Sequence, residues 1–290
     1  MSSATAIDLS KVPFPDVVEE LSFETLFAQM AESVRLGIPG VIDPLPDFDE
    51  TIESDPAVKV LQAAAHWRLF DRQRVNDAAM AVMVAYATGA DLDNLAVLAQ
   101  VTRLAGESDD DLRERIILAP ESYSVAGPEL AYIYHALSAD PDVADASATS
   151  PSPGEVVVSI LSRTGDGEAG APLIATVASV LTADEIRPLT DSVTVQSATI
   201  VEYSITASLW TFSGPDRATV LAEAAVKLDA YVAESRKIGR DITRNGIGSA
   251  LRVAGVQNVT IASPAADVVI SSTQAAHCTG IILNDMGTAA

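Results

Sequence analysis

The spacing of apolar residues divides the chain near residue 125. From Pro15 to about Ala119, apolar residues recur three and four positions apart, and proline and glycine occur only at breaks. This spacing is typical of amphipathic helices. Beyond residue 125 the period is mixed and includes strand-like alternation. The pattern therefore predicts an α+β protein, with a helical N-terminal arm and a long-helix bundle followed by two small α+β domains.

The longest predicted helix begins after Asp55 and ends at Gly89. Asp55 is a favourable N-cap, Pro56 suits the first helical position, and glycine is a common C-terminal stop. The interval of about 32 residues corresponds to roughly 48 Å of helix. Two arginines lie in a heptad seam along it, and they either snorkel out of an ordinary helix pair or belong to a seam shared between chains. The seam positions are Leu61, Ala65, Arg68, Arg72, Val75, Ala79, Val82 and Tyr86.

Two acidic clusters follow, and both are interpreted as helix starts. Asp91, Asp93 and Asn94 alternate like the start of a calcium-binding EF-hand loop, but the glycine at the sixth position and the acid at the twelfth are missing. Asp91 is therefore predicted to be an N-cap. Ser108 is predicted to cap the next helix, with the carboxylates of 109–111 in its first turn, where the helix dipole favours negative charge.

A faint internal repeat occurs in the second half of the chain. Residues 131–161 and 246–272 each contain a helix ending in Ala-Leu, a short turn, a strand, a Ser-Pro corner and a second apolar strand. The sequence therefore predicts that a helix followed by a hairpin is used twice. The first strands of the two units begin at Val143 and Val256, and the corners lie at Pro151 and Pro264.

Further elements complete the two predicted α+β domains. The first unit continues into a helix over 172–181 and a strand over 192–197, while the second unit is preceded by a strand over 200–212 and a helix over 215–235. The alternation changes phase near Ala198, which indicates a boundary. The predicted domains are 1–54 (an arm with short helices), 55–124 (a helical domain with the long helix), 125–198 (the first α+β domain) and 199–290 (the second).

A glycine-rich turn raises the question of cofactor binding. Gly165, Gly167 and Gly170 have the G-x-G-x-x-G spacing of a dinucleotide-binding turn. Asp166 and Glu168 would repel phosphates there, and the preceding strand is predicted to be the second arm of a hairpin and not the first strand of a βαβ unit. A loop is therefore preferred, with Gly165 and Gly167 at positive φ. The alternative is a nucleotide-binding enzyme that uses this turn.

Composition and charge narrow the classes of partner. The 290 residues are 48% hydrophobic, which suits a sizeable core. With 40 acidic and 18 basic residues the formal net charge is −22, so direct binding to nucleic acid or to an anionic membrane is disfavoured. The first residues lack a basic segment followed by an apolar one, and no apolar run approaches a membrane span. These features favour a cytoplasmic protein without membrane insertion.

Candidate catalytic and metal-binding residues are sparse. Cys278 is the single cysteine, so an internal disulfide and a cysteine-based zinc site are excluded, and the expected role of Cys278 is a small buried side chain in a strand. His66, His135 and His277 are scattered, and none has a second ligand at metal spacing. Motifs for nucleophilic elbows, zinc proteases and phosphate loops do not occur. The sequence therefore predicts no catalytic residues, no metal and no cofactor.

Several stretches in colinear order resemble a known family. They cover nearly the whole chain, and they resemble the baseplate assembly protein J family of temperate contractile-tailed phages. The stretches are AIDLSKVPFPDVVEELSFE at the N-terminus, RQRVNDAAMAVMVAYATGADLDNLA, SVAGPELAYIYHALSADPDVADASATSPSPGEVVVSILSRTGDG, and ASPAADVVISSTQAAHCT near the C-terminus.

The resemblance implies a structural role and no enzymatic activity. Members of this family are similar to wedge proteins of contractile baseplates, which clamp the end of the tail tube in a sixfold ring and rearrange when the sheath contracts. The implied partners are other copies of the chain and neighbouring wedge proteins, and the implied location is the virion, after assembly in the host cytoplasm. Arg68, Arg72 and Arg74 form the densest basic cluster of an acidic chain and are the candidate contact residues. A free soluble regulator with the same folds is a further alternative.

Overall fold

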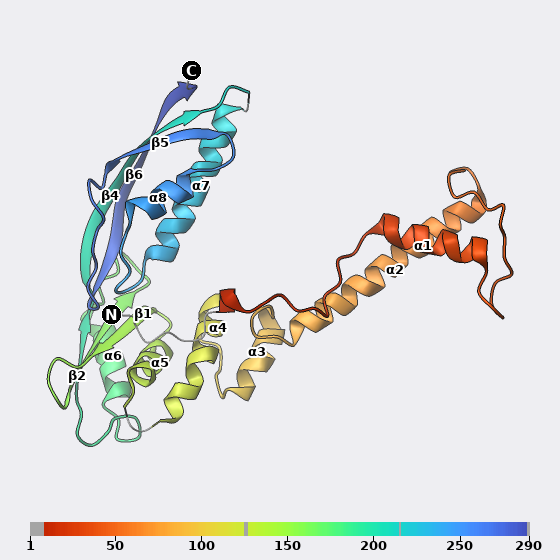
Figure 1. Ribbon diagram of the computed structural model, residues 1–290. Helices are drawn as coiled ribbons and strands as arrows, with labels where there is room; N and C mark the ends of the chain where they lie inside the picture. Colours follow the sequence, from red (N-terminus) through yellow and green to blue (C-terminus); the bar gives the residue numbers. More distant parts are fainter. Residues whose placement is uncertain (1–8, 125–126, 215, 289–290) are drawn as a thin grey trace. The chain divides into compact units, whose positions relative to one another are not determined.

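The computed structural model describes residues 9–124, 127–214 and 216–288 and contains two compact units (Figure 1). Of the described residues, those up to Thr102 form one unit, whose regular elements are helices. Those from Arg103 onward form the other, which contains two separate three-stranded sheets with helices packed on them. This combination confirms the α+β class.

The helical unit has its core between its first two long helices. Ala31, Phe48 and Val58 are buried there, so the first helix, the connecting segment and the second helix each contribute one apolar side chain. The side chain of Ser22 accepts a hydrogen bond from the Thr25 amide and caps the first helix. The helices of this unit are α1 (Phe23–Leu36), α2 (Pro56–Ala81) and α3 (Gly89–Leu98), after a 3-10 turn at Leu9–Lys11.

Helix α2 is long, but it ends earlier than predicted. The side chain of Asp55 accepts a hydrogen bond from the Ala57 amide at 2.8 Å, and Pro56 lies in the first turn, so the predicted start is confirmed. The helix spans 26 residues and stops at Ala81. Residues 82–88 form turns instead of a further helical segment.

The predicted helix stop at Gly89 is wrong, because α2 has already ended at Ala81. Gly89 has a φ of +54° and is the first residue of α3, whose N-cap is Thr88. Asp91, predicted to be an N-cap, lies in the first turn of α3, where its carboxylate still faces the positive end of the helix dipole. The β-branched residues Val82 and Val84 lower helix propensity where α2 ends, which the apolar spacing did not reveal.

The second unit begins with helices that flank the first sheet. Ser108 caps α4, because its side chain accepts a hydrogen bond from the Asp111 amide at 3.2 Å, and three carboxylates occupy the first turn. Both features were predicted. The helices are α4 (Asp109–Leu118), a 3-10 turn at Ala119–Tyr123, and α5 (Glu129–Ala139).

The first sheet has the order β1-β2-β3. The first two strands form an antiparallel hairpin, as predicted, and the central strand also pairs in parallel with the third. Ile160 of the central strand and Val177 and Leu181 of the covering helix α6 are fully buried. The elements are β1 (Val143–Thr149), β2 (Glu155–Ser162), α6 (Ala171–Leu181) and β3 (Ser192–Ser197).

This topology corrects the expectation about the glycine-rich turn. Because β2 and β3 are parallel and α6 connects them, β2, α6 and β3 form a βαβ unit. The turn therefore does lie between the strand and the helix of such a unit. The expectation was wrong because it treated membership of a hairpin and membership of a βαβ unit as mutually exclusive. A strand has two edges, and β2 pairs with β1 along one edge and with β3 along the other.

The second sheet has the order β5-β4-β6. Ile205, Ala207 and Leu209 of its central strand are fully buried, and they pack in one core with Leu228 and Leu251 of the two covering helices. The strands are β4 (Thr199–Thr211), β5 (Val256–Ser263) and β6 (Gln274–Thr288), and the helices are α7 (Arg217–Ser235) and α8 (Arg244–Leu251).

The predicted second hairpin is wrong. The apolar stretch between Pro264 and Ser272, expected to be the second arm, forms no strand and makes only an isolated bridge from Val268 to Ile242. Strand β5 instead pairs antiparallel with one edge of β4, and β6, which begins at Gln274 and was not predicted, pairs in parallel with the other edge. A long central strand offers backbone groups along both edges, and each edge here has a partner.

Ala198 connects the last strand of the first sheet to the central strand of the second. Ala198 lies between β3 and β4, and its amide donates a hydrogen bond to the Ile160 carbonyl at 2.8 Å. Its side chain is buried in a small cluster with Leu161 and Ala275. This cluster joins the first sheet to the second domain.

Candidate functional site

The predicted contact residues lie close together on α2. Arg68 and Arg74 are exposed, and Arg72 is half-buried. Nη1 of Arg72 lies 2.9 Å from Oε2 of Glu19, and the two side chains are 39% and 54% exposed. An ion pair with this exposure contributes about 0–1 kcal/mol to stability. The three guanidinium groups are therefore accessible, and one of them has a partner within the chain.

The seam of α2 is partly filled by the chain itself. Ala65 is fully buried, whereas Val75 of the same seam is exposed. Buried Asn76 accepts a hydrogen bond from the Glu19 amide at 3.0 Å and donates one to the Glu19 carbonyl at 2.8 Å. Together with the ion pair to Arg72, these bonds hold the segment before α1 on α2. One part of the seam is therefore filled by the chain itself, and another part is exposed.

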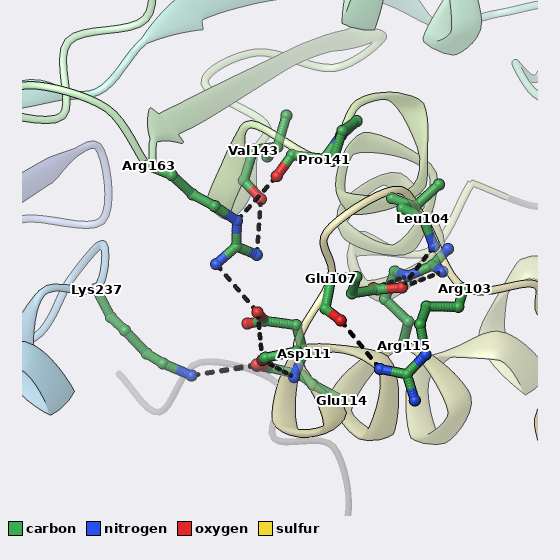
Figure 2. Close-up of polar contacts among 11 residues, drawn as sticks. Arg103, Leu104, Glu107, Asp111, Glu114, Arg115, Pro141, Val143, Arg163 and Lys237 are labelled. Atoms are coloured by element: carbon green, nitrogen blue, oxygen red, sulfur yellow. Dashed lines mark hydrogen bonds and ion pairs between the residues drawn. The ribbon is translucent and has the colours of Figure 1, made fainter. Parts of the chain in front are cut away.

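A second candidate region is a polar junction at the start of α4 (Figure 2). The guanidinium of Arg115 donates from Nε and Nη2 to the two carboxylate oxygens of Glu107, at 2.6 and 2.9 Å. The two side chains are only 5% and 4% exposed. The Leu104 amide also donates to Glu107, and Arg115 reaches the Ser138 hydroxyl on α5 at 3.1 Å. The paired charges are thus hydrogen-bonded on several sides, as burial requires.

Other charged residues of α4 reach the two sheet domains. Arg163, which follows β2, lies 3.1 Å from an oxygen of Asp111, and its Nε donates to the Pro141 carbonyl at 2.9 Å. Lys237, which follows α7, lies 3.3 Å from an oxygen of Glu114. Helix α4 is thereby connected to both α+β domains of its unit, as Figure 2 shows.

Asp145 of β1 lies where the two α+β domains meet. One carboxylate oxygen accepts a hydrogen bond from the Ile238 amide at 2.7 Å, and the other accepts one from the Ala146 amide at 2.9 Å. Desolvation raises the pKa of Asp145 to about 6, and the charge of Glu114 acts in the same direction. The bond from Ile238 and the charge of Lys237 oppose that rise in pKa. The contact between the domains is therefore sensitive to pH.

Sequence reasoning missed this junction. The acidic run 107–111 was interpreted only as the start of a helix, yet its members also pair with Arg103, Arg115 and Arg163. The pair formed by Arg115 spans eight positions, which is not a neighbouring distance on a helix. The available signal was the alternation of arginines with acids at 103–115 in a chain poor in basic residues.

The glycine-rich turn is closed by contacts within the chain. Gly165 and Gly167 have φ values of +60° and +108°, as predicted. The Glu168 amide donates to the Asp166 side chain, and the Ala169 amide donates to the Ser197 hydroxyl. These two amides, which would face a phosphate in a dinucleotide-binding turn, are therefore already used. The turn connects β2 to α6, and its amides are satisfied within the chain.

Arg236 of the C-terminal domain also closes this turn. Its Nη2 donates to the Gly165 carbonyl at 2.8 Å. A Cβ atom on Gly167 would lie 2.6 Å from Cδ1 of Leu161, so the backbone approaches a buried side chain closely there. Gly170 has an ordinary negative φ and no such crowding. The first two glycines are thus required by the fold, and the third is not.

The single cysteine and the histidines lie apart. Cys278 lies in the strand β6, as expected, but it is only half-buried against the core of the C-terminal domain, so the expected full burial is wrong. His66 lies on α2, His135 on α5 and His277 on β6. Within residues 9–124, 127–214 and 216–288, no three His, Cys, Asp or Glu side chains are grouped so that they could hold a metal ion. None of the helices described is long and apolar enough to cross a membrane.

Comparisons with known proteins define the class to which this architecture belongs. Three family models match the chain in order: the Baseplate J-like N-terminal domain at 53–110, the Baseplate J-like central domain at 124–197, and the Baseplate J-like protein C-terminal domain at 203–284. The chain therefore belongs to the baseplate J-like family. The second and third matches coincide with the two α+β domains.

One relative is similar in sequence over almost the whole length of the chain. Baseplate protein J of Escherichia phage P2 is 45% identical over 288 residues, an alignment that covers 94% of this chain and 95% of that protein. A structural comparison finds the cryo-EM structure of the anti-feeding prophage baseplate, described as sixfold symmetrised, with a TM-score of 0.41 and 14% identity over 61% of this chain and 43% of that chain. That likeness is too weak to support a conclusion.

Proposed function

We propose that the protein is a structural component of the baseplate wedge of a contractile phage tail or tail-like particle, and that it assembles into a sixfold ring around the tail tube. Its identity of 45% with Baseplate protein J of phage P2, over 94% of the chain, carries this proposal. Two homologous proteins that align from end to end share their domain order and, in general, their place in an assembly. The protein would then be located in the tail baseplate of the virion, after assembly in the host cytoplasm.

The partners in this proposal are other copies of the chain and neighbouring wedge proteins. The formal charge of −22 disfavours direct contact with nucleic acid or insertion into an anionic membrane. The protein would have no catalytic residues and no cofactor. Its polar junction at α4, with the buried pair of Glu107 and Arg115, would keep the two α+β domains in a fixed arrangement while the particle changes shape.

The exposed surface of α2 is the part of the chain that we assign to assembly. Arg68, Arg72 and Arg74 would face acidic surfaces of a neighbouring subunit. The same helix exposes Val60 and Trp67, at 70% and 69%, so an apolar contact area accompanies the charges. Mixed surfaces with an exposed tryptophan and arginines are typical of protein interfaces.

A complementation experiment tests the proposed role. Host cells would produce particles in the absence of this chain and, in a parallel culture, with the chain restored from a plasmid. We expect tails without a baseplate in the first culture, as seen by negative-stain electron microscopy, and complete tails in the second. Immunogold labelling should place the restored chain at the end of the tail distal to the head. Complete tails without the chain would disprove the proposal.

The nucleotide-binding alternative has its own test. A nucleotide present at a hundredfold excess over its dissociation constant would stabilise the folded protein by about 2.7 kcal/mol. Because the amides of Glu168 and Ala169 are already hydrogen-bonded within the chain, we expect no such gain in thermal stability with NAD or ATP. A concentration-dependent rise in melting temperature would support an enzyme instead.

A further inference from the structure

A polar groove on the C-terminal domain is distinct from all the residues discussed so far. It lies between α8 and β5 and encloses about 560 Å³. Arg244, Asn245, Ser249 and Arg252 line it from the helix and its end, and Thr260 lines it from the strand. Two arginines and no acidic residue are among the described residues that line the groove.

The two arginines of the groove lie in different environments. Arg244 is anchored, because its guanidinium donates to the carbonyls of Pro264 and Ile261, and its backbone amide donates to the Asp267 side chain at 2.7 Å. Arg252 is exposed and lies directly after the last turn of α8. One positive charge is therefore fixed in place, and the second can adjust to a ligand.

Backbone groups of β5 beside the groove already have hydrogen-bond partners. The Ile261 carbonyl accepts a hydrogen bond from Arg244 at 2.9 Å, and the Val259 amide donates to the side chain of Asn258 at 2.9 Å. An added strand would have to displace both contacts. A ligand in this groove is therefore recognised through its side chains, by charge, and not by pairing with the strand.

The distribution of charge along the chain indicates the kind of ligand. Residues 199–290 contain eight acidic and seven basic side chains, whereas residues 1–198 contain 32 acidic and 11 basic ones. The segment 43–55 alone contains six acids and no basic residue. Most of the negative charge thus lies outside the domain that has the basic groove, and complementary patches of this kind favour association between copies.

The acidic segment offers carboxylates at a suitable spacing. Asp43 and Asp47 are exposed, whereas Glu50 pairs with Arg35 and Asp55 caps α2. Prolines at 44 and 46 favour an extended chain, which over four residues spans up to about 12 Å. Arg252 follows Arg244 by eight positions, a rise of about 12 Å along a helix.

We propose that the groove between α8 and β5 binds the acidic segment 43–55 of a second copy of this chain, with Asp43 and Asp47 facing Arg252 and Arg244. The match of charge and of spacing carries this inference. It goes beyond the proposed place of the protein in the baseplate and holds for the purified chain alone. The contact is heterologous, since a groove on one copy meets a different surface on the next.

Sedimentation velocity of the full chain at low and high salt tests the inference. The unmodified chain should associate as its concentration rises, and added salt should weaken the association. The variant Arg252→Glu should weaken it about tenfold or more, because like charges would then face each other. Lys227→Glu, an exposed change on α7 with the same change of charge, is the matched control and should associate like the unmodified chain.

Mixing two variants identifies the occupant. Arg252→Glu and the double variant Asp43→Lys/Asp47→Lys should each associate weakly alone, but a mixture of the two should form pairs, since the unchanged acidic segment of the first variant meets the unchanged groove of the second. Circular dichroism should show that both variants are folded. An unmodified chain that stays monomeric at every concentration, a control variant as weak as Arg252→Glu, or a mixture without pairs would each overturn the proposal.

Discussion

Two groups of charged side chains in this molecule differ sharply in burial. At the start of α4, the side chains of Glu107 and Arg115 are 4% and 5% exposed, whereas Arg72 of α2 and its partner Glu19, from the segment before α1, are 39% and 54% exposed. Removal of one partner from a buried pair costs about 3–5 kcal/mol, while an exposed pair contributes about 0–1 kcal/mol. The same residue types thus stabilise the fold in one region and remain available to partners in the other.

The largest expected effect on stability comes from breaking the buried pair. Arg115→Met leaves the Glu107 carboxylate without its charged partner, so the free energy of unfolding should fall by about 3–5 kcal/mol. Arg72→Met is the matched control, with an expected loss of about 1 kcal/mol or less. Urea denaturation followed by circular dichroism measures both.

A double replacement sharpens this prediction. Arg115→Met combined with Glu107→Leu removes both charges and should recover much of the stability lost in the single variant, because no unpaired charge remains in the interior. Equal losses for Arg115→Met and Arg72→Met would mean that burial does not distinguish the two regions.

The next largest effect is expected in the glycine-rich turn. Gly167→Ala should lower the free energy of unfolding by about 2 kcal/mol or more, since positive φ costs about 1 kcal/mol and the new Cβ would lie 2.6 Å from a Leu161 carbon. Gly165→Ala should cost only about 1 kcal/mol, because nothing lies within 4 Å of its Cβ position. Thermal denaturation of the two variants measures the difference, and a loss of nucleotide affinity in either would support the enzyme alternative.

The contact at Asp145 predicts a dependence of stability on pH. Its pKa is about 6 in the folded protein, against an ordinary 3.8. Between these values the folded protein holds a proton that the unfolded chain has released. The contribution of this group is therefore fully present below about pH 4 and is lost as the pH rises to about 6, by at most about 1.4 kcal/mol per pH unit.

The variant Asp145→Asn isolates that contribution. Other carboxylates titrate in the same range, so the quantity to compare is the difference in unfolding free energy between the unmodified chain and the variant, measured by denaturation from pH 4 to pH 8. The difference should change between pH 4 and 6 and stay constant above. A difference that does not vary with pH would contradict the assignment.

The smallest effect on stability is expected on α2, where the effect on assembly is large. Reversal of Arg68, Arg72 and Arg74 to glutamate should shift the unfolding free energy by less than about 0.5 kcal/mol at each of the exposed positions 68 and 74, and by about 1 kcal/mol or less at Arg72, which pairs with Glu19, yet block incorporation into baseplates. Lys59→Glu on the same helix is a control for the change of charge. If the triple variant is folded and enters baseplates at the normal rate, these arginines make no contact with a partner.

Much of the fold is predictable from local signals. Examples are the cap at Asp55, the cap at Ser108 and the first hairpin, which all follow from residue types within a few positions of one another. The end of α2 and the order β5-β4-β6 do not, because they depend on weak helix propensity near Val82 and on pairing between strands that are distant in sequence.

The charged junction was less predictable than the strands. Arg115 and Ser138 come together only through packing of α4 on α5, and Lys237 reaches Glu114 across 123 positions. Side chains that meet in this way leave no spacing pattern in the sequence. In the glycine-rich turn, by contrast, the sequence contains a pattern without the corresponding site. Its spacing matches the dinucleotide-binding motif, but the amides of Glu168 and Ala169 are hydrogen-bonded within the chain.

A cryo-EM reconstruction of the intact particle's tail end, made without imposed symmetry, tests the central claim most directly. The account predicts density for this chain repeated around the tail tube with sixfold symmetry, with the two α+β domains and the helical unit recognisable in each copy. Density for the chain without sixfold repetition would contradict the proposed ring. A particle whose tail end contains no copy of the chain would contradict the structural role itself.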